Sequence, residues 1–275
     1  MSAGVGMMAV VSTIVFLHAH PDDEASQTSG SMARAADDGH RVVVVFATNG
    51  DHGEAPEDLA PGETVVHRRR READTSAAAI GLHRVAWLGY KDSGMTGWEQ
   101  NTHEGAFAAA PVDEAAARLA AVLDEEDADV VVGYDWHGGY GHPDHVQVHR
   151  VLHRGADLAA RRPRVLESTM NRDAMRRLFD GARAAGLGGA DWDPDGPMDD
   201  GNPLGTPEAE IHLQVDVSDY LEHRRAALAA HASQATDVGA FLGMPDEVFA
   251  HLFGTEHYLE QGREPGMRQG WIFDD

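Results

Sequence analysis

The chain has no cysteine, a single lysine and no long apolar segment. Without cysteine it can form neither disulfides nor thiolate metal sites, and it has no cysteine nucleophile, so any metal must be bound by histidine and carboxylate. No apolar run approaches the roughly 20 residues of a membrane helix. The first residues also lack the basic segment of a secretory signal. We therefore expect a cytoplasmic protein with no membrane partner.

Basic residues are scarce as well. The chain has 22 Lys and Arg against 46 Asp and Glu, a formal net charge of -24. Such a charge repels phosphate backbones, so we expect no nucleic-acid partner. The remaining composition is that of an ordinary globular protein, with 42% hydrophobic residues. A length of 275 residues fits one large domain better than two, and we expect residues 1–275 to form a single domain.

Short apolar runs alternate with longer segments of helical periodicity. The runs that predict buried strands are 14–17, 42–47, 85–88, 130–133 and 165–169. The segments that predict helices are 25–38, 63–80, 113–125 and one that begins near Pro143. Continuous β-branched strands separated by helices indicate parallel strands that are covered on both faces. The expected fold is α/β: a three-layer α/β/α sandwich, Rossmann-like, with a mostly parallel sheet.

The pattern is looser toward the C-terminus. Residues 186–205 are rich in Gly, Asp and Pro and predict a loop or lid. Residues 211–217 alternate polar and apolar side chains, which predicts a half-exposed edge or antiparallel strand. Residues 218–231 predict a helix with Ser218 as its N-cap.

The first group of candidate site residues is the segment His20-Pro21-Asp22-Asp23-Glu24, where the first predicted strand ends. Ligands of doubly wound sheets bind at that edge. Pro21 cannot continue a sheet ladder and fixes a turn. Around that turn His20 and Asp23 could face one metal ion, which leaves Asp22 for proton transfer. Acidic residues also favour helix N-termini without any metal, but that explains neither the histidine nor the proline.

The second group follows the fourth predicted strand, in the glycine- and aromatic-rich segment 134–145, which ends in a second His-Pro-Asp. His145 can complete a His/Asp/His set that leaves a position open for water, as in catalytic zinc sites. His142, beside the metal without binding it, could act as an imidazolium that faces a developing oxyanion. We interpret His149 and His153, at i+4 and i+8 from His145, as residues of a solvated helix face or as neighbours of the site, and not as metal ligands.

With both segments in view, the chain resembles the PIG-L/LmbE-like de-N-acetylases, zinc enzymes that remove acyl groups from N-acylated aminosugars. Residues 19–24 match the family's AHPDDE motif, and residues 142–145 match its HPDH motif. The resemblance extends from about residue 14 to 258 and is strongest to the mycothiol branch, which comprises a deacetylase and an S-conjugate amidase. Further segments that support this branch are 92–95, 138–141, 215–220 and 230–234.

The resemblance implies a role for each matching residue. The implied zinc ligands are His20, Asp23 and His145, with Asp22 as the general base. His142 would stabilise the oxyanion and protonate the leaving amine. The other implied residues are Asp144, which orients His142; Tyr140, near the tetrahedral intermediate; and Arg69 and Asp92, which bind the sugar. Arg69 is one of four consecutive arginines, 68–71, so a solvated helix face is its alternative.

Several alternatives stay open. The substrate could be a mycothiol S-conjugate or a sugar-bearing natural product, and the metal could be Fe²⁺ instead of Zn²⁺. His18-x-His20-x-Asp22-Asp23 nearly matches the two-metal motif of metallo-β-lactamases, although Asp23 replaces its last histidine. A binuclear TIM-barrel amidohydrolase would need a carboxylated lysine, and Lys91 is the only lysine. A non-catalytic sugar-binding protein on this scaffold is a further alternative. The sequence leaves the oligomeric state open.

Overall fold

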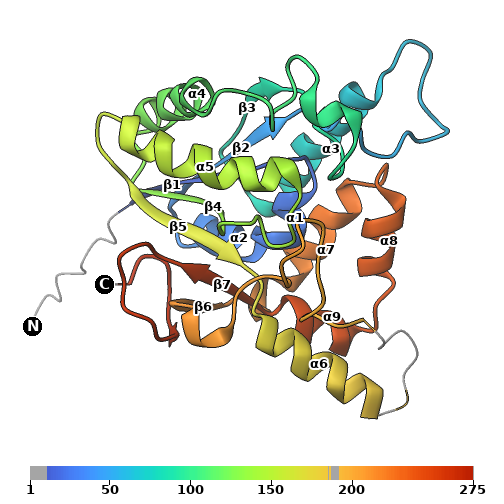
Figure 1. The fold of residues 1–275 in the computed structure, drawn as a ribbon, viewed down its shortest axis with the longest axis vertical. Helices are drawn as coiled ribbons and strands as arrows, with labels where there is room; N and C mark the ends of the chain where they lie inside the picture. Colours follow the sequence, from blue (N-terminus) through green and yellow to red (C-terminus); the bar gives the residue numbers. More distant parts are fainter. Residues whose placement is uncertain (1–10, 185, 187–191, 275) are drawn as a thin grey trace, which may run out of the picture.

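A computed structural model describes residues 11–184, 186 and 192–274. Within these residues one sheet holds eight strands in the order β3-β2-β1-β4-β5-β7-β6-β8 (Figure 1). Five of them make up the parallel part: β1 (Thr13–His18), β2 (Arg41–Thr48), β3 (Arg84–Tyr90), β4 (Val130–Tyr134) and β5 (Arg164–Thr169). The remaining strands are β6 (Leu213–Asp216), β7 (Thr255–Leu259) and β8 (Arg268–Gln269).

Strand β1 lies at the centre of the parallel part. It pairs in parallel with β2 on one side and with β4 on the other, and Ile14 is opposite both Val42 and Val130. Strand β7 runs antiparallel to β5 and to β6. The predicted α/β fold with a mostly parallel sheet is therefore confirmed, and all five predicted parallel strands are present.

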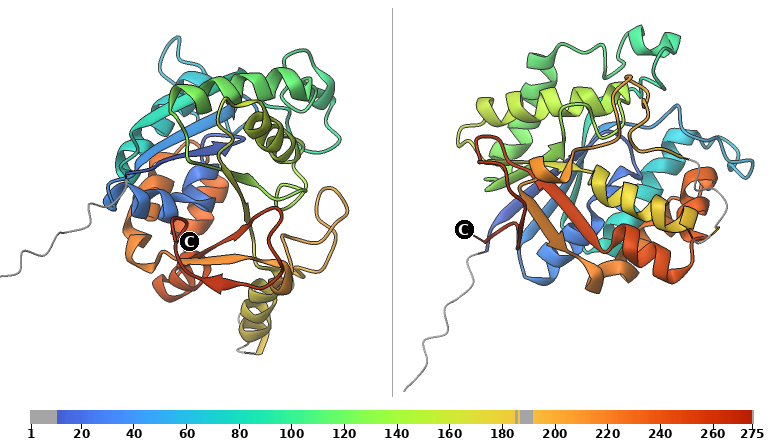
Figure 2. Two further views of the ribbon diagram at one scale, coloured as in Figure 1. Left: turned by 90° about the vertical axis from the view of Figure 1, so that its left-hand side faces the viewer. Right: turned by 60° about the horizontal axis from the view of Figure 1, so that its bottom comes forward.

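Helices cover both faces of the sheet (Figure 2). On one face, α4 (Val112–Glu125) and α5 (Pro143–Leu158) pack over a core that includes Val15 and Leu17. On the other, a core that includes Ile14 and Phe16 packs against α2 (Ser29–Asp37), α3 (Val65–Ile80) and α7 (Leu221–Ala230). Successive residues of β1 thus enter opposite cores, as the alternation of side chains along a strand requires.

The prediction of one helix over residues 25–38 is wrong about where the helix begins and about its being unbroken. Helix α1 (Asp23–Gln27) already begins inside the acidic motif, and Thr28 separates it from α2. The Oγ1 atom of Thr28 lies 2.8 Å from Nε2 of His18 at the end of β1. This buried side-chain hydrogen bond links the residue between α1 and α2 to the end of β1.

The C-terminal predictions are partly confirmed. Strand β6 is antiparallel to β7, as predicted, but β8 pairs with its other side, so it is not an edge. Ser218 does not cap a helix; it bonds Asp216 and starts a 3-10 turn, and α7 follows with Tyr220 at its N-cap. Helices α6 (Arg172–Ala184), α8 (Ala235–Leu242) and α9 (Asp246–Phe253) were not predicted.

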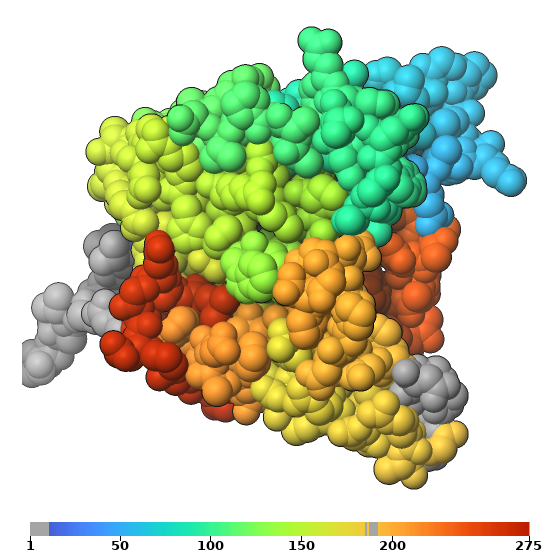
Figure 3. Space-filling model, in the orientation of Figure 1, coloured from blue at the N-terminus to red at the C-terminus, as the bar shows by residue number. Residues whose placement is uncertain are grey.

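In the predicted loop 186–205, the described residues 186 and 192–205 contain no helix or strand, and 187–191 lie outside the described residues. This segment, in yellow-orange in Figure 3, lies against the glycine-rich loop after β4. The Gly205 N–H donates to Gly139 O at 2.7 Å, and the Asp199 N–H donates to Tyr140 O at 3.2 Å. None of the described helices combines the length and apolar character that crossing a membrane takes.

Candidate functional site

The two His-Pro-Asp segments meet at the carboxyl edge of the sheet. His20 follows β1, and the second segment leads from β4 into the first turn of α5. Strands β1 and β4 are neighbours, and the chain runs outward from them in opposite directions along the sheet. This is the switch point at which open α/β sheets bind ligands. Sequence-distant residues that were predicted to act together therefore lie together.

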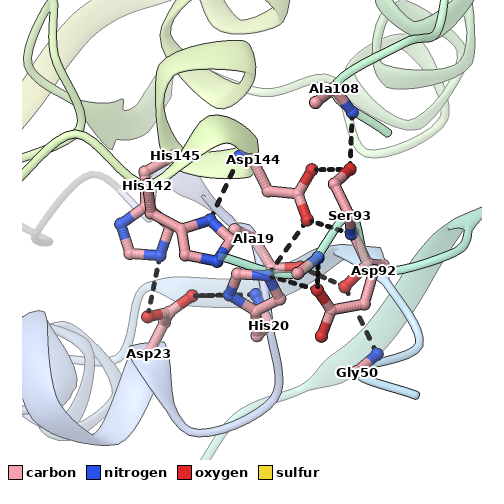
Figure 4. Close-up of polar contacts among 12 residues, drawn as sticks. Ala19, His20, Asp23, Gly50, Asp92, Ser93, Ala108, His142, Asp144 and His145 are labelled. Atoms are coloured by element: carbon pink, nitrogen blue, oxygen red, sulfur yellow. Dashed lines mark hydrogen bonds and ion pairs between the residues drawn. The ribbon is translucent and has the colours of Figure 1, made fainter. Parts of the chain in front are cut away.

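Asp23 lies between the two predicted metal-binding histidines (Figure 4). Its Oδ2 atom is 3.3 Å from Nδ1 of His20, and its Oδ1 atom is 3.3 Å from Nε2 of His145. All three side chains are buried. Two imidazoles around one carboxylate are the N/O donor set that zinc binds.

In each of the two imidazoles, the hydrogen bonds leave one nitrogen atom free to bind a metal. Nδ1 of His145 donates to Gly138 O at 3.1 Å, and its Nε2 is buried with no hydrogen-bond partner. Nε2 of His20 lies 3.1 Å from Oδ2 of Asp144, so it can donate there and keep the Nδ1 lone pair on the side of Asp23. Such outer hydrogen bonds fix the tautomer of metal-binding histidines. The residues present therefore fit a divalent metal.

Gly138 is required by the close approach of its loop to α5. Its φ is +67°, and a Cβ added there would lie 2.2 Å from Cβ of His145. The left-handed conformation aims its carbonyl at Nδ1 of His145. The glycine next to the second motif thus positions a predicted metal ligand.

His142 also lies close enough to be considered as a ligand, since ligand atoms of His20, His142 and His145 lie within 4.8 Å of one another. However, Nδ1 of His142 accepts the Asp144 N–H at 3.1 Å. A ring that accepts at Nδ1 carries its proton on Nε2, which leaves no lone pair for a metal. Burial and the neighbouring histidines also lower the pKa of His142. The structure thus favours a neutral Nε2–H donor over the expected imidazolium.

Asp144 contacts His142 only through that backbone N–H. Its carboxylate accepts the N–H of Ser93 at 2.9 Å and the Ser93 hydroxyl at 2.5 Å, and it faces His20. The backbone of Asp144 therefore contacts the ring of His142, whereas its carboxylate contacts Ser93 and His20. Ser93 is a residue that sequence reasoning missed, although its segment, 92–95, had been noted.

Asp22 has the strained backbone of an active-site residue, with φ at 112°. Glu24 Oε2 accepts its N–H at 2.8 Å. Burial raises the pKa of Asp22 to about 6, against the opposing effect of Arg69. A carboxylate with such a pKa can exchange protons near neutral pH. Glu24 in turn bonds Nε2 of His231 at 2.6 Å, and this buried pair is a second feature that sequence reasoning missed.

Arg69 is the one arginine among 68–71 that is buried. Its guanidinium donates to Oδ2 of Asp22 at 2.8 Å, to Gly50 O at 3.0 Å and to Pro21 O. The register of the arginine run is thus settled, but the contacts of Arg69 are with the proposed base and its turn. Arg69 also lines the cavity described next, where a sugar would reach it.

One cavity of about 620 Å³ joins these residues. Its polar end includes Asp22, Arg69, Asp92 and Tyr140. Asp92 lies there with Oδ1 at 3.5 Å from Nε2 of His20. The apolar part of the lining, called the apolar wall below, comes from α6, α8 and α9, which also contribute Asp237 and His251; its residues are Ala174, Met175, Leu178, Val238, Phe241, Leu252 and Phe253. All site residues that were predicted from the sequence therefore line this cavity or lie immediately behind it.

Fold and site together define a hydrolase of the metal-dependent amide-cleaving kind. Residues 15–155 match the model of the family described as PIG-L, GlcNAc-PI de-N-acetylase. The chain belongs to the PIG-L family, and it is an enzyme of that family's amide-hydrolysing type.

Curated relatives match along nearly the whole chain. A 1D-myo-inositol 2-acetamido-2-deoxy-alpha-D-glucopyranoside deacetylase of Streptomyces avermitilis is 36% identical over 95% of this chain and 96% of its own. A protein of the same name from Thermobifida fusca is 35% identical over 92% of this chain and 94% of its own. The resemblance seen in the motifs is therefore confirmed.

Solved structures share the fold at lower identity. Teicoplanin deacetylase in its zinc-inhibited form has a TM-score of 0.57 at 16% identity, over 92% of this chain and all of its own (100%). The N,N'-diacetylchitobiose deacetylase from Pyrococcus horikoshii has a TM-score of 0.53 at 21% identity, over 86% of this chain and 73% of its own. A 4-carboxy-2-hydroxymuconate hydratase from Pseudomonas putida has a TM-score of 0.53 at 14% identity, over 94% of this chain and 100% of its own. Since a hydratase shares it, the fold alone does not choose the reaction.

Proposed function

We propose that the chain is a zinc-dependent hydrolase that removes the acetyl group, or another acyl group, from an N-acylated aminosugar. The observation that carries the proposal is the arrangement around Asp23, with one histidine on each side and the raised-pKa carboxylate of Asp22 beside it. His20, Asp23 and His145 would hold the metal. The relatives named as deacetylases of a GlcNAc-inositol support the substrate class. The cytoplasmic location stays a prediction.

The metal, when bound, would polarise the amide carbonyl and acidify a water molecule. Asp22 accepts the proton of the attacking water, because its pKa of about 6 makes it a carboxylate at neutral pH and still a usable acid once protonated. The Nε2–H of His142 donates to the oxygen of the tetrahedral intermediate. Tyr140, which also lines the cavity, would donate to the same oxygen.

The proton for the leaving amine comes, on this geometry, from Asp22. His142 would have to become an imidazolate to give up its Nε2 proton, since its Nδ1 accepts the Asp144 N–H. The same carboxyl group therefore serves first as base and then as acid. The sequence analysis assigned the protonation of the leaving amine to His142, and the present proposal assigns it to Asp22 instead.

Variants at the two adjacent aspartates test the proposal. Asp22→Asn should retain the zinc of this site and lose about 10²- to 10⁴-fold in kcat, the usual contribution of a general base. Asp23→Asn should lose the zinc of this site. Asp74→Asn, an exposed aspartate on α3, is the matched control. Release of free amine from GlcNAc-inositol measures activity, and elemental analysis measures zinc. A fully active Asp22→Asn would refute the assignment of the base.

The apolar wall favours a second candidate substrate. A GlcNAc-inositol is polar throughout, whereas Met175, Leu178 and Phe241 present apolar surface to the cavity. Desolvation of that surface would favour a substrate that carries an apolar group, such as a mycothiol S-conjugate or a glycosylated natural product. A direct comparison of kcat/KM for GlcNAc-inositol, free N-acetylglucosamine and an aromatic mycothiol S-conjugate decides between them. If Phe241→Ala raises KM for the conjugate alone, the wall binds its apolar group.

A further inference from the structure

A second group of side chains of the types that bind metals lies outside the candidate active site, between α5 and β5. His149 and His153 are four residues apart on α5, so they lie on the same side of the helix. Glu167 belongs to β5. One ligand atom from each of the three lies within 4.8 Å of the other two. The group shares no residue with the set formed by His20, Asp23 and His145.

Glu167 is a carboxylate at a position where the fold calls for an apolar residue. Val165, two residues earlier and on the same face of β5, is part of the core beneath α5. The side chain of Glu167 is only 11% exposed. Its Oε1 atom lies 2.7 Å from Nε2 of His153, and its Oε2 atom lies 3.9 Å from Nδ1 of His149. A nearly buried carboxylate needs a cation or several donors around it.

A hydrogen bond between His153 and Glu167 accounts for those two residues, but not for the presence of His149 beside the same carboxylate. The two imidazole rings are 4.7 Å apart between centroids. Nδ1 of His149 can only donate to Tyr134 O, at 3.2 Å, so its Nε2 carries a lone pair. Burial lowers the pKa of His149, which keeps the ring in the neutral form that binds metals. His145 of the catalytic set has the same kind of carbonyl bond.

We propose that His149, His153 and Glu167 form a second zinc-type cation site, which fastens α5 to β5. Two imidazoles and one carboxylate are a complete protein donor set for zinc, with water as the fourth ligand. The histidine side chains are 23% and 21% exposed, so a cation and its water can reach them from solvent. The cation braces the helix whose first turn carries His142 and His145.

Zinc stoichiometry in four forms of the full chain tests the proposal. The wild type should bind two equivalents of Zn²⁺, as measured by elemental analysis after equilibration with buffered zinc. His149→Gln/His153→Gln should bind one and keep its deacetylase activity. Asp23→Ala should also bind one, and the combined variant none. His223→Gln, which removes an exposed histidine from α7, is the matched control and should bind two.

Calorimetry and thermal unfolding give independent readouts. Titration of Zn²⁺ into protein whose catalytic site is already loaded should show one saturable site in the wild type and none in His149→Gln/His153→Gln. Added zinc should raise the Tm of Asp23→Ala but not of the combined variant. Glu167→Gln, which preserves side-chain shape, should also lose the second equivalent. A wild type that binds only one equivalent, or a double variant that keeps the second, overturns the site. Two equivalents in Asp23→Ala would instead refute the catalytic ligand set.

Discussion

The contact between Arg69 and Asp22 leads to a prediction about the pH dependence of catalysis. Arg69 Nη2 lies 2.8 Å from Oδ2 of Asp22. Its positive charge favours the carboxylate form, and burial favours the neutral form, which raises the pKa of Asp22 to about 6. Arg69→Met removes the charge and leaves the burial, so the pKa of Asp22 should rise further.

The sign and size of the effect follow from the role of the base. Asp22 must be a carboxylate to accept a proton, so activity falls as the pH drops through its pKa. An adjacent arginine typically lowers a carboxyl pKa by about 1–3 units, and its removal should move the acidic limb of the profile upward by that amount. A bound metal would, like Arg69, lower the pKa of Asp22, and it would do so in the wild type and in Arg69→Met alike. The informative quantity is therefore the difference between the pH profiles of the two proteins.

The assay is kcat/KM for amine release from GlcNAc-inositol as a function of pH. Arg70→Met is the control, because Arg70 is the exposed neighbour, and its acidic limb should coincide with that of the wild type. At high pH, where Asp22 is a carboxylate in every protein, Arg69→Met should recover activity relative to neutral pH. If the acidic limbs of Arg69→Met and the wild type coincide, Asp22 is not the group that titrates, or Arg69 does not control it.

Three further predictions concern residues behind the metal centre. Asp144→Asn should weaken zinc binding by about 10- to 100-fold, because it removes the negative charge that faces Nε2 of His20 and leaves one acceptor oxygen where both accept hydrogen bonds; competition with a zinc chelator measures this. His231→Ala should lower the free energy of unfolding by about 3–5 kcal/mol in urea titrations, because it leaves the buried carboxylate of Glu24 without its ionic partner. Gly138→Ala should displace α5 or its own loop, since the new Cβ would lie 2.2 Å from His145, and should lose zinc and activity together.

Each of these has a control or a contrary outcome. Asn101→Ala removes contacts to the same loop as Ser93 without touching Asp144, and its zinc affinity should stay at the wild-type level. Unchanged unfolding of His231→Ala would show that Glu24 finds other partners or a proton. Normal zinc content in Gly138→Ala would show that the carbonyl bond to His145 is dispensable.

The sequence by itself determined the sheet and the edge at which the proposed reacting groups lie. Continuous β-branched runs at β1, β2 and β4 can be buried only on both faces, so the parallel sandwich followed from local pattern and spacing. Two His-Pro-Asp turns after such strands had to lie at one edge. The proposed ligands and base could be named for that reason, since each is adjacent in sequence to a strand end.

The tertiary structure decided everything that depends on contacts between distant segments. Only packing shows that Arg69, and not a neighbouring arginine, reaches Asp22, or that the carboxylate of Asp144 faces Ser93 and His20. The raised pKa of Asp22 is a property of its burial, which no local motif encodes. The apolar wall is formed by α6, α8 and α9. Helices α8 and α9 have only 8 residues each, too few for their periodicity to predict a helix, whereas α6 has 13 residues and was missed by the sequence analysis. The proposed substrate preference rests on that wall, because only the folded chain assembles its apolar surface beside the proposed metal ligands.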